Sequence, residues 1–353
     1  MLPHKQDFIN YLLSNNYSEK TLFNYNRDLS AFESYLDLNQ ISFSSITRQT
    51  VDNFKSVLRT PEHHKLFTSK ANEVNRSEMP QDESKIKSRV KRRLLTTNSV
   101  AGLASKSVNR MLSSLRKYLR YLIINDFECP LAPDRIEFVK REKKQIELAN
   151  YDDLVRLIES PDIFEKKEIN KARNRAFLEL LFSTGMRISE ACNLNLEQLG
   201  HYDVATKSFI INEKAFITGK GRKQRYVYLT PRCQHFLVRY INLRDDDYPA
   251  LFIPTKGSRL NSDDKNTIRV SNNYFQMKIV KYRKLLGINI KTSAHSLRHG
   301  FATYMAEKGA NVVALQTMLG HESLETTTKY LHTPEKLAED THRDYHPLNN
   351  WDV

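Results

Sequence analysis

Apolar residues recur at helical spacing near the start of the chain. In the segment 18–37 they follow Ser18, a candidate N-cap, and occupy Leu22, Tyr25, Leu29, Phe32 and Leu36. The segment 105–126 has the same pattern, with Val108, Met111, Leu112, Leu115, Leu119 and Leu122. Such stripes are typical of amphipathic helices that pack on one another. We expect a helical domain over residues 1–137.

The pattern changes beyond about residue 148, where helical stretches are interrupted by short runs of β-branched and aromatic residues. The runs KSFIINE (207–213) and RYVYLT (225–230) predict strands. TGKGRKQ (218–224) precedes the second run, and its two glycines suit a tight turn, which places Lys220 at a hairpin tip. We therefore expect a mainly α fold with a small antiparallel β-sheet, whose second domain occupies residues 149–353.

Two polar segments interrupt this organisation. The first, at about 60–104, contains KIKSRVKRR (85–93), in which six of nine residues are basic and none is acidic. It predicts either a flexible surface insertion or a basic arm that docks on DNA, and we favour the arm. The second, 138–148, contains Lys140 and Arg141 and predicts a basic interdomain linker.

The charge of the chain indicates a polyanionic partner. Its 55 Lys and Arg residues exceed 41 Asp and Glu residues, and the net charge is +14. Such an excess favours nucleic acid or an anionic membrane. No run of 18 apolar residues is present, and the start, MLPHKQDFINYLL, lacks a signal-peptide layout. We expect a cytoplasmic protein with no membrane partner.

Cysteines and exposed cations refine this expectation. Cys129, Cys192 and Cys233 are scattered without paired spacing, which argues against a disulfide framework or a zinc ribbon.

Four cations in the segment 105–126 lie off its apolar stripe: Arg110, Arg116, Lys117 and Arg120. Each could contact phosphates, although a solvated helix face explains any single one equally well.

The stretch AHSLRHG (294–300) brings two histidines and an arginine together. His295 and His299 share a helix face, which raises the alternative of a metal pair. Arg298 would place a fixed positive charge beside such a metal, and no acid or cysteine nearby in sequence completes a ligand shell. Guanidinium and imidazole donors instead match the oxygens of a phosphate.

Other segments supply residue types that phosphate chemistry needs. STGMRISEACNL (183–194) places Arg187 near Glu190, and MLGHESLETTTKYLHT (318–333) contains His321 and Tyr330. Each is weak alone, because a packed tyrosine or a hydrogen-bonded histidine is the commoner occupant of such positions. A lysine between two glycines, such as Lys220, is usually a solvated turn charge or a plain phosphate contact.

Taken together, these segments carry a family resemblance. Four segments, by their residues and their order, resemble the tyrosine recombinase (phage integrase) family, most closely its bacterial Xer-like branch. They are TGMRISEA, GKGRKQR, HSLRHGFAT and LGHESLETTTKY. The front segment SEKTLFNYNRDLSAFESYL resembles that family's core-binding, SAM-like region. The resemblance implies an N-terminal core-binding domain and a C-terminal catalytic domain that form a C-shaped clamp around DNA.

The resemblance also implies a role for each site residue. Tyr330 would attack a DNA phosphodiester to give a 3′-phosphotyrosyl intermediate, with His295 as its general acid/base partner and Lys220 as the acid for the leaving 5′-oxygen. The remaining catalytic donors would be Arg187, Arg298 and His321, supported by Glu190 and His299. Lys214 and Lys223 are alternatives to Lys220. No metal is implied, because the two arginines would stabilise the charge on the phosphate as a metal ion does elsewhere. No nucleotide cofactor is implied either, because the ester conserves the bond energy.

The implied partners follow from the same resemblance. The first partner is double-stranded DNA with an inverted-repeat core site. On this DNA the chain would form a homotetramer, or a heterotetramer with a related recombinase. The tail EKLAEDTHRDYHP (335–347) resembles the Xer-type helix that docks on a neighbouring protomer. Further DNA contacts would come from Lys140, Arg141, Arg222 and Lys223. Two roles are compatible with the resemblance: chromosome dimer resolution, and integration or excision of a mobile element. An FtsK-like activator is an option for the first role only.

Two other functions stay open at this level. One is a type IB-like enzyme that relaxes or resolves DNA without exchanging strands between sites, and the other is a DNA-binding protein that has lost catalysis. The Xer-type tail favours strand exchange over the first. The complete set of Arg, Lys, His and Tyr residues argues against the second.

Overall fold

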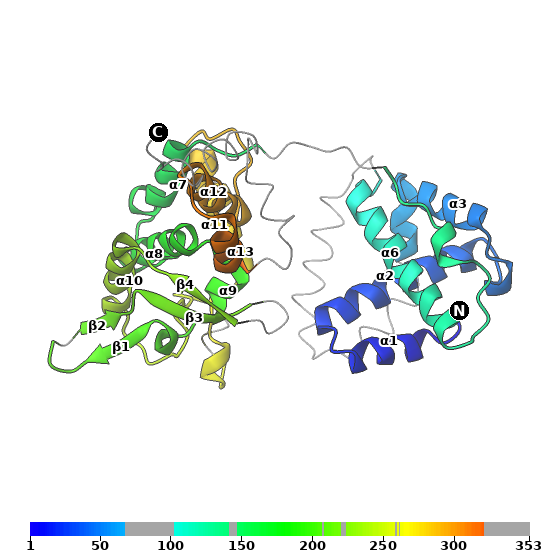
Figure 1. The fold of residues 1–353 in the computed structure, drawn as a ribbon, viewed down its shortest axis with the longest axis horizontal. Helices are drawn as coiled ribbons and strands as arrows, with labels where there is room; N and C mark the ends of the chain where they lie inside the picture. The colour runs from blue at the N-terminus through cyan, green and yellow to red at the C-terminus, as the bar shows by residue number, and fades with distance from the viewer. Residues whose placement is uncertain are drawn as a thin grey trace, which may run out of the picture. The chain divides into compact units, whose positions relative to one another are not determined.

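The computed structural model describes residues 1–67, 102–140, 147–206, 208–219, 224–257, 260 and 262–320. The chain divides into two compact units, Met1–Lys144 and Gln145–Val353. Each is described by itself below (Figure 1). In the part of the chain described here, no helix is both long and apolar enough to cross a membrane.

The first unit is built from helices, as its apolar pattern predicts. Its elements are α1 (Lys5–Ser14), α2 (Glu19–Leu38), η1 (Phe43–Ser45), α3 (Arg48–Leu58), η2 (Pro61–Phe67), α6 (Ser105–Ile124) and η3 (Pro133–Arg135). Ser18 caps α2 by accepting a hydrogen bond from the backbone N–H of Thr21. All six residues of the stripe predicted for 105–126 are buried in α6. Both predicted helices are therefore confirmed, whereas 68–101 of the polar segment lies outside the described residues.

A buried acid joins α2 to α6, which the sequence pattern did not reveal. Asp28 lies outside the apolar stripe of its helix, yet it is buried and accepts hydrogen bonds from Arg110 and from the Ser114 hydroxyl. Burial raises the pKa of the Asp28 carboxyl, and the bonds from Arg110 and Ser114 offset only part of that effect. The pattern of apolar residues cannot report such a contact, because it depends on which charge meets Asp28 across the helix pair.

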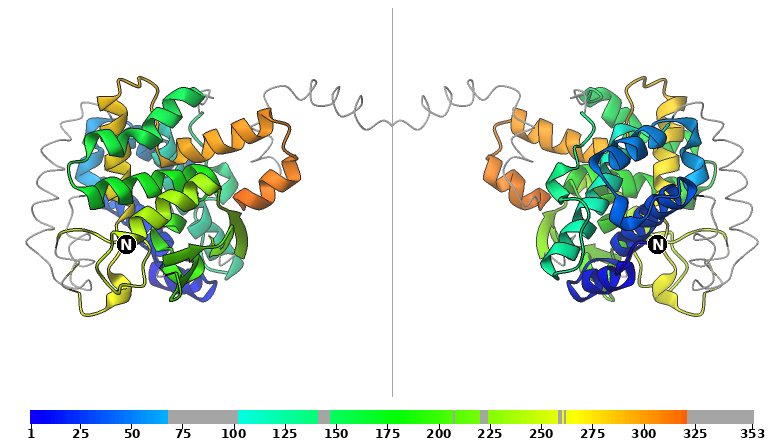
Figure 2. Two further views of the ribbon diagram at one scale, coloured as in Figure 1. Left: turned by 90° about the vertical axis from the view of Figure 1, so that its left-hand side faces the viewer. Right: turned by 90° about the vertical axis from the view of Figure 1, so that its right-hand side faces the viewer.

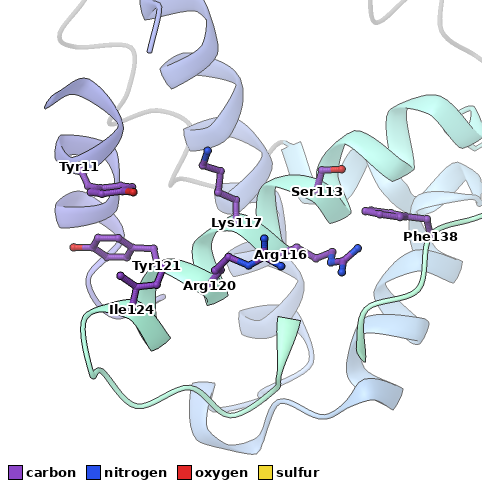
Figure 3. Close-up of a pocket in the computed structure, with 8 residues that line it drawn as sticks. All are labelled: Tyr11, Ser113, Arg116, Lys117, Arg120, Tyr121, Ile124 and Phe138. Atoms are coloured by element: carbon purple, nitrogen blue, oxygen red, sulfur yellow. The ribbon is translucent and has the colours of Figure 1, made fainter. Parts of the chain in front are cut away.

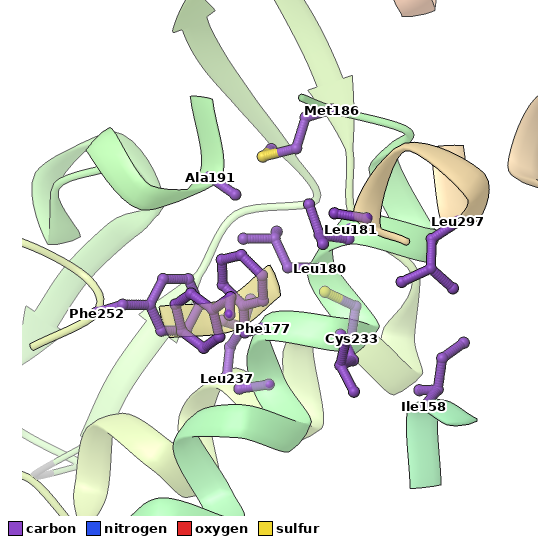
Figure 4. Packing of buried hydrophobic residues seen from close by; sticks show 14 of the residues in the cluster. Ile158, Phe177, Leu180, Leu181, Met186, Ala191, Cys233, Leu237, Phe252 and Leu297 are labelled. Carbon is purple, nitrogen blue, oxygen red and sulfur yellow. The ribbon is translucent and has the colours of Figure 1, made fainter. Parts of the chain in front are cut away.

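The second unit is organised around one buried helix. Its helical elements are α7 (Tyr151–Phe164), α8 (Glu168–Thr184), α9 (Ile188–Asn193), η4 (Leu196–Gln198), α10 (Pro231–Asn242), η7 (Lys265–Thr267), α11 (Asn272–Leu285), α12 (Ala294–Glu307) and α13 (Val312–Leu319). Helix α8 contacts α7, α10 and α12. Phe177 on α8 lies against Phe252 and Phe275, at the centre of the cluster shown in Figure 4. This core fixes the ends of α8 and α12, where the site residues lie.

The expected small antiparallel sheet is present as two separate hairpins. Strand β1 (Gly200–Asp203) pairs with β2 (Ser208–Ile211), and β3 (Lys214–Thr218) pairs with β4 (Gln224–Tyr228). The run KSFIINE thus pairs with an earlier strand, and the partner of RYVYLT is KAFIT. Ala215, Ile217 and Val227 of the second hairpin are buried, so its inner face belongs to the core.

Helix α13 doubles back beside α12 at the end of the described chain (Figure 2). The turn between them contains Gly309, whose φ is 83°. Helix α13 then ends at Gly320, which has a left-handed conformation with φ 63°. This residue is the last that the structure describes before the segment that contains His321 and Tyr330.

Substitution of Gly185 by alanine should destabilise the second unit more than the same change at Gly287. Both glycines have positive φ, 61° and 69°, so each alanine costs roughly 1 kcal/mol in backbone strain. A Cβ at Gly185 would lie 2.5 Å from the Phe301 ring, whereas one at Gly287 meets nothing within 4 Å. The crowding adds about 1–2 kcal/mol for Gly185→Ala. Urea unfolding followed by circular dichroism measures the difference, and equal losses would contradict it.

Candidate active site

The described members of the predicted site lie where α8 ends and where α9 and α12 begin. Gly185 ends α8 in the left-handed conformation, and Arg187 two residues later is the N-cap of α9. The Glu190 side chain accepts a hydrogen bond from the Arg187 backbone N–H at 2.8 Å. This capping interaction holds Glu190 beside Arg187, whose own side chain is one-third exposed.

Glu190 is shared between two arginines. Arg187 Nη1 donates to Glu190 Oε1 at 2.9 Å, while Arg225 Nη1 and Nη2 donate to Oε1 and Oε2 at 3.1 and 2.7 Å. Burial alone would raise the pKa of Glu190, but the hydrogen bonds from Arg225 and Arg187 outweigh it and hold that pKa below its usual value. Glu190 is therefore ionised at neutral pH, and the cluster has two positive charges and one negative charge.

Arg298 is almost completely buried, with 2% of its surface exposed. It donates from Nη1 to the carbonyl of Gly185 at 2.8 Å and from Nη2 to the carbonyl of Leu319 at 2.6 Å. It thereby connects the end of α8 with the end of α13 from its own place on α12. A buried guanidinium with carbonyl partners at two helix ends is a favourable arrangement, because helix C-termini present unpaired carbonyls and a partial negative charge.

Three arginines converge on the end of α13. The carbonyls of Met318, Leu319 and Gly320 accept hydrogen bonds from Arg225 Nε at 2.9 Å, Arg298 Nη2 at 2.6 Å and Arg187 Nη2 at 3.3 Å, respectively. These arginines come from β4, α12 and the start of α9. The arrangement fixes the point from which the chain continues to His321, one residue beyond Gly320.

His295 and His299 lie in the first turns of α12. Their rings are 4.2 Å apart between centroids and meet edge to face. His295 is exposed and His299 is partly buried. Burial, together with the nearby His295 and Arg298, lowers the pKa of His299 to about 4. His299 is thus a neutral group at neutral pH, beside a histidine that faces solvent.

Several predicted site residues lie outside the described part of the chain. They are Lys220, His321 and Tyr330 of the catalytic set and Arg141, Arg222 and Lys223 of the predicted DNA contacts. Lys214, an alternative to Lys220, lies at the opposite end of the β3–β4 pairing from the 219–223 connection, and its Nζ lies over the Tyr226 ring. Arg225 belongs to the same cluster, although the motifs did not indicate it; it is the last residue of GKGRKQR.

The cations of α6 line a groove of about 410 Å³ in the first unit (Figure 3). Arg116 and Arg120 both donate to Asp134, and Lys117 donates to the Tyr17 hydroxyl. The apolar part of the groove includes Phe138, over which the Arg116 guanidinium lies. Other lining residues are Tyr11, Ser113, Tyr121 and Ile124. Arg110 differs from these three cations because its partner is the buried Asp28.

His299 should make the stability of the protein depend on pH between 4 and 7. In the unfolded chain a histidine gains a proton near pH 6.5, whereas folded His299 gains one near pH 4, so stability falls as the pH is lowered through this window. His299→Gln removes this group. From pH 7 to 4 the unfolding free energy of this variant should therefore fall by about 3 kcal/mol less than that of the wild type. Urea unfolding at each pH measures the slope. His235→Gln, on the exposed face of α10, is the control, and an unchanged slope in His299→Gln would contradict the assignment.

Both units of the chain match known protein families. Residues 149–336 match the phage integrase family, and residues 6–69 match the phage integrase N-terminal SAM-like domain. A tyrosine recombinase XerC of Chlamydia caviae is 31% identical over 350 residues, which cover 96% of this chain and 97% of that protein. A XerC of Thermodesulfovibrio yellowstonii is 30% identical over 282 residues, 77% of this chain and 86% of that protein.

Solved structures share the fold. A XerH site-specific recombinase bound to a palindromic difH substrate has a TM-score of 0.55 at 20% identity, and 96% of this chain and 94% of that one are covered. A lambda integrase dimer bound to a COC′ core site has a TM-score of 0.60 at 14% identity, with 92% and 97% covered. From the family match and the Xer relatives, the chain belongs to the phage integrase family and is a tyrosine recombinase of the Xer type, an enzyme that exchanges DNA strands at specific sites.

Proposed function

We propose that Tyr330 is the nucleophile of this recombinase. Its phenolic oxygen attacks the scissile phosphorus, the bond from phosphorus to the 5′-oxygen breaks, and a 3′-phosphotyrosyl ester and a 5′-hydroxyl result. A 5′-hydroxyl of the partner strand then attacks the ester and releases Tyr330. Bond energy is conserved in both steps, so no nucleotide cofactor is consumed.

The convergence of three arginines on the end of α13 is the observation that supports this proposal most strongly. It joins the two predicted phosphate-binding residues, Arg187 and Arg298, to the residue that directly precedes His321. The segment that contains Tyr330, nine residues beyond His321, therefore starts from a fixed position at Gly320. The proposal thus connects the described cation cluster to the segment that carries the nucleophile.

Each predicted residue receives one chemical task. Arg187 and Arg298, with His321, stabilise the negative charge that builds on the non-bridging oxygens in the transition state. Lys220 protonates the leaving 5′-oxygen, and His295 accepts the proton of Tyr330, whose unperturbed pKa of about 10 leaves little phenolate at neutral pH. Glu190 and His299 support these groups without contact to the phosphate.

The substrate is double-stranded DNA with an inverted-repeat core site, bound by a tetramer of this chain or of this chain with a related recombinase. Relatives of known structure were solved on such DNA, namely a difH substrate and a COC′ core site. The groove cations Arg116, Lys117 and Arg120, with Lys140, Arg141, Arg222 and Lys223, provide phosphate contacts. Chromosome dimer resolution with an FtsK-like activator, or integration and excision of a mobile element, would take place in the cytoplasm on the nucleoid.

Substitution of Tyr330 by phenylalanine should abolish covalent attachment to DNA while DNA binding persists. The substrate is an inverted-repeat duplex selected by retention on the Tyr330→Phe protein from a random library, then nicked so that religation fails. Wild-type protein with EDTA present should give a slowly migrating adduct in a denaturing gel. Without the phenolic oxygen no ester can form, so Tyr330→Phe should give none.

The matched control is Tyr202→Phe, which removes a hydroxyl from an exposed tyrosine on β1 and should leave the adduct at the wild-type level. An adduct with Tyr330→Phe would assign the nucleophile to another residue. Binding of the selected DNA by wild type without any adduct would instead favour a DNA-binding protein without catalysis.

Replacement of Arg120 by alanine should weaken DNA binding through the loss of a phosphate contact. Arg120 lines the groove and is 61% exposed, and its acid partner, Asp134, is also paired with Arg116. The slope of log affinity against log salt should fall in magnitude by roughly 0.9. Gel-shift titrations at several salt concentrations measure it.

Lys65→Ala provides the comparison for this measurement. Lys65 lies on η2, is similarly exposed at 59%, and does not line the groove. Its removal should leave the salt slope unchanged. An equal change in both variants would mean that Arg120 contributes only general charge.

A further inference from the structure

Arg225 forms a set of contacts that none of the predicted catalytic roles explains. It lies on β4 with 8% of its side chain exposed. All three of its guanidinium nitrogens donate hydrogen bonds, two to the Glu190 carboxylate and one to the Met318 carbonyl. Parallel bonds from a guanidinium to both oxygens of a carboxylate form a strong and directional pair. A lysine cannot reproduce this geometry.

The pair with Glu190 bears directly on the charge of Arg187. If Arg187 were the only partner of Glu190, the carboxylate would neutralise it. Because Arg225 occupies both carboxylate oxygens, Arg187 shares Oε1 and the cluster keeps a net positive charge. Arg187 is the more exposed of the two arginines, at 33% against 8%, so the excess charge is presented to a ligand through Arg187.

The contact with α13 bears on the segment that follows it. A Cβ placed on Gly320 would lie 3.1–3.3 Å from three side-chain atoms of Arg225, so the guanidinium packs directly over this glycine. Arg225 Nε also holds the carbonyl of Met318 two residues earlier, at 2.9 Å. One side chain therefore contacts both Glu190 and the last three residues of chain before His321.

We propose that Arg225 is a positioning residue for strand cleavage, which sets the orientation and charge of Arg187 through Glu190 and anchors the end of α13 from which the nucleophile segment continues. This inference rests on the proposed function, because it assigns Arg187 to the scissile phosphate. Arg225 itself touches neither the phosphate nor Tyr330 in this scheme.

The test compares cleavage of two linkages by wild type, Arg225→Lys and Arg187→Lys. One nicked substrate has the normal phosphate, and the other has a methylphosphonate, in which a methyl group replaces one non-bridging oxygen and removes the negative charge. Arg225→Lys should cleave the phosphate about 10- to 100-fold more slowly than wild type, because a small displacement of a charge-stabilising group is costly. The deficit should shrink on the neutral methylphosphonate, as it should for Arg187→Lys, because that linkage needs less cationic stabilisation.

A matched control separates positioning from general stability. Arg244 has 3% of its side chain exposed and, like Arg225, donates to one carboxylate, that of Asp246, and to backbone carbonyls, including that of Ala250 at 2.7 Å. Arg244→Lys should lower the unfolding midpoint without changing the ratio of cleavage on the two linkages. Gel shifts confirm that each variant binds the same DNA.

Each outcome decides between alternatives. An equal deficit of Arg225→Lys on both linkages overturns the proposal and leaves Arg225 a structural residue. A third substrate has a 5′-bridging phosphorothiolate, whose thiolate leaves without a proton. If this substrate removes the deficit of Arg225→Lys, as it should remove that of Lys220→Ala, Arg225 acts on the general acid and the proposal is overturned. Absence of any adduct with wild type rejects the proposed function and, with it, the role of Arg225.

Discussion

The buried guanidinium of Arg298, held between the carbonyls of Gly185 and Leu319, is the contact on which the site depends. It is enclosed by the core of the second unit and reaches the ends of two helices that are far apart in sequence. Both acceptors are backbone carbonyls at helix ends, so this one buried side chain holds the two ends in place. Helix α13 consequently ends at a defined position, and Arg187 and Arg225 can bond its neighbouring carbonyls. The same residue types that suit a phosphate thus serve to hold the backbone in place around it.

Charge balance is the second constraint. Two arginines surround one buried carboxylate, Glu190, whose pKa is held below its usual value by their hydrogen bonds. A second carboxylate here would neutralise the cluster, whereas none would leave two guanidinium groups to repel each other in a place that water screens poorly. With one carboxylate between them, the two arginines stay close together and the cluster keeps a net positive charge that attracts an anion. His299 fits this balance because burial, together with the nearby His295 and Arg298, keeps it neutral at pH 7.

Local patterns predicted the helices and the family motifs, but they could not predict the contacts between distant elements. The stripes of α2 and α6 and the Ser18 cap were confirmed because they depend on spacing within one helix. Asp28 lies outside the apolar stripe of α2 and is nevertheless buried, since a residue 82 positions away supplies its guanidinium partner. Arg225 was missed for the same reason: nothing in RYVYLT indicates that its first residue meets Glu190 and Met318. The pairing of β2 with β1 was also not evident, because KSFIINE and KAFIT have equally good strand composition.

The cations proposed to contact DNA form hydrogen bonds to acceptors of the protein itself. Arg116 and Arg120 share Asp134, Arg187 shares Glu190, and the end of α13 provides carbonyls to all three arginines of the site. Exposed pairs of this kind contribute little to stability, so a phosphate can replace Asp134 as a partner at small cost. The buried contacts of Arg298 and Arg225 are different, because their exchange would disturb the helix ends themselves. DNA binding is therefore expected to rearrange the groove of α6 freely, while it leaves the anchor at α13 intact and draws mainly on Arg187, the most exposed member of the arginine cluster.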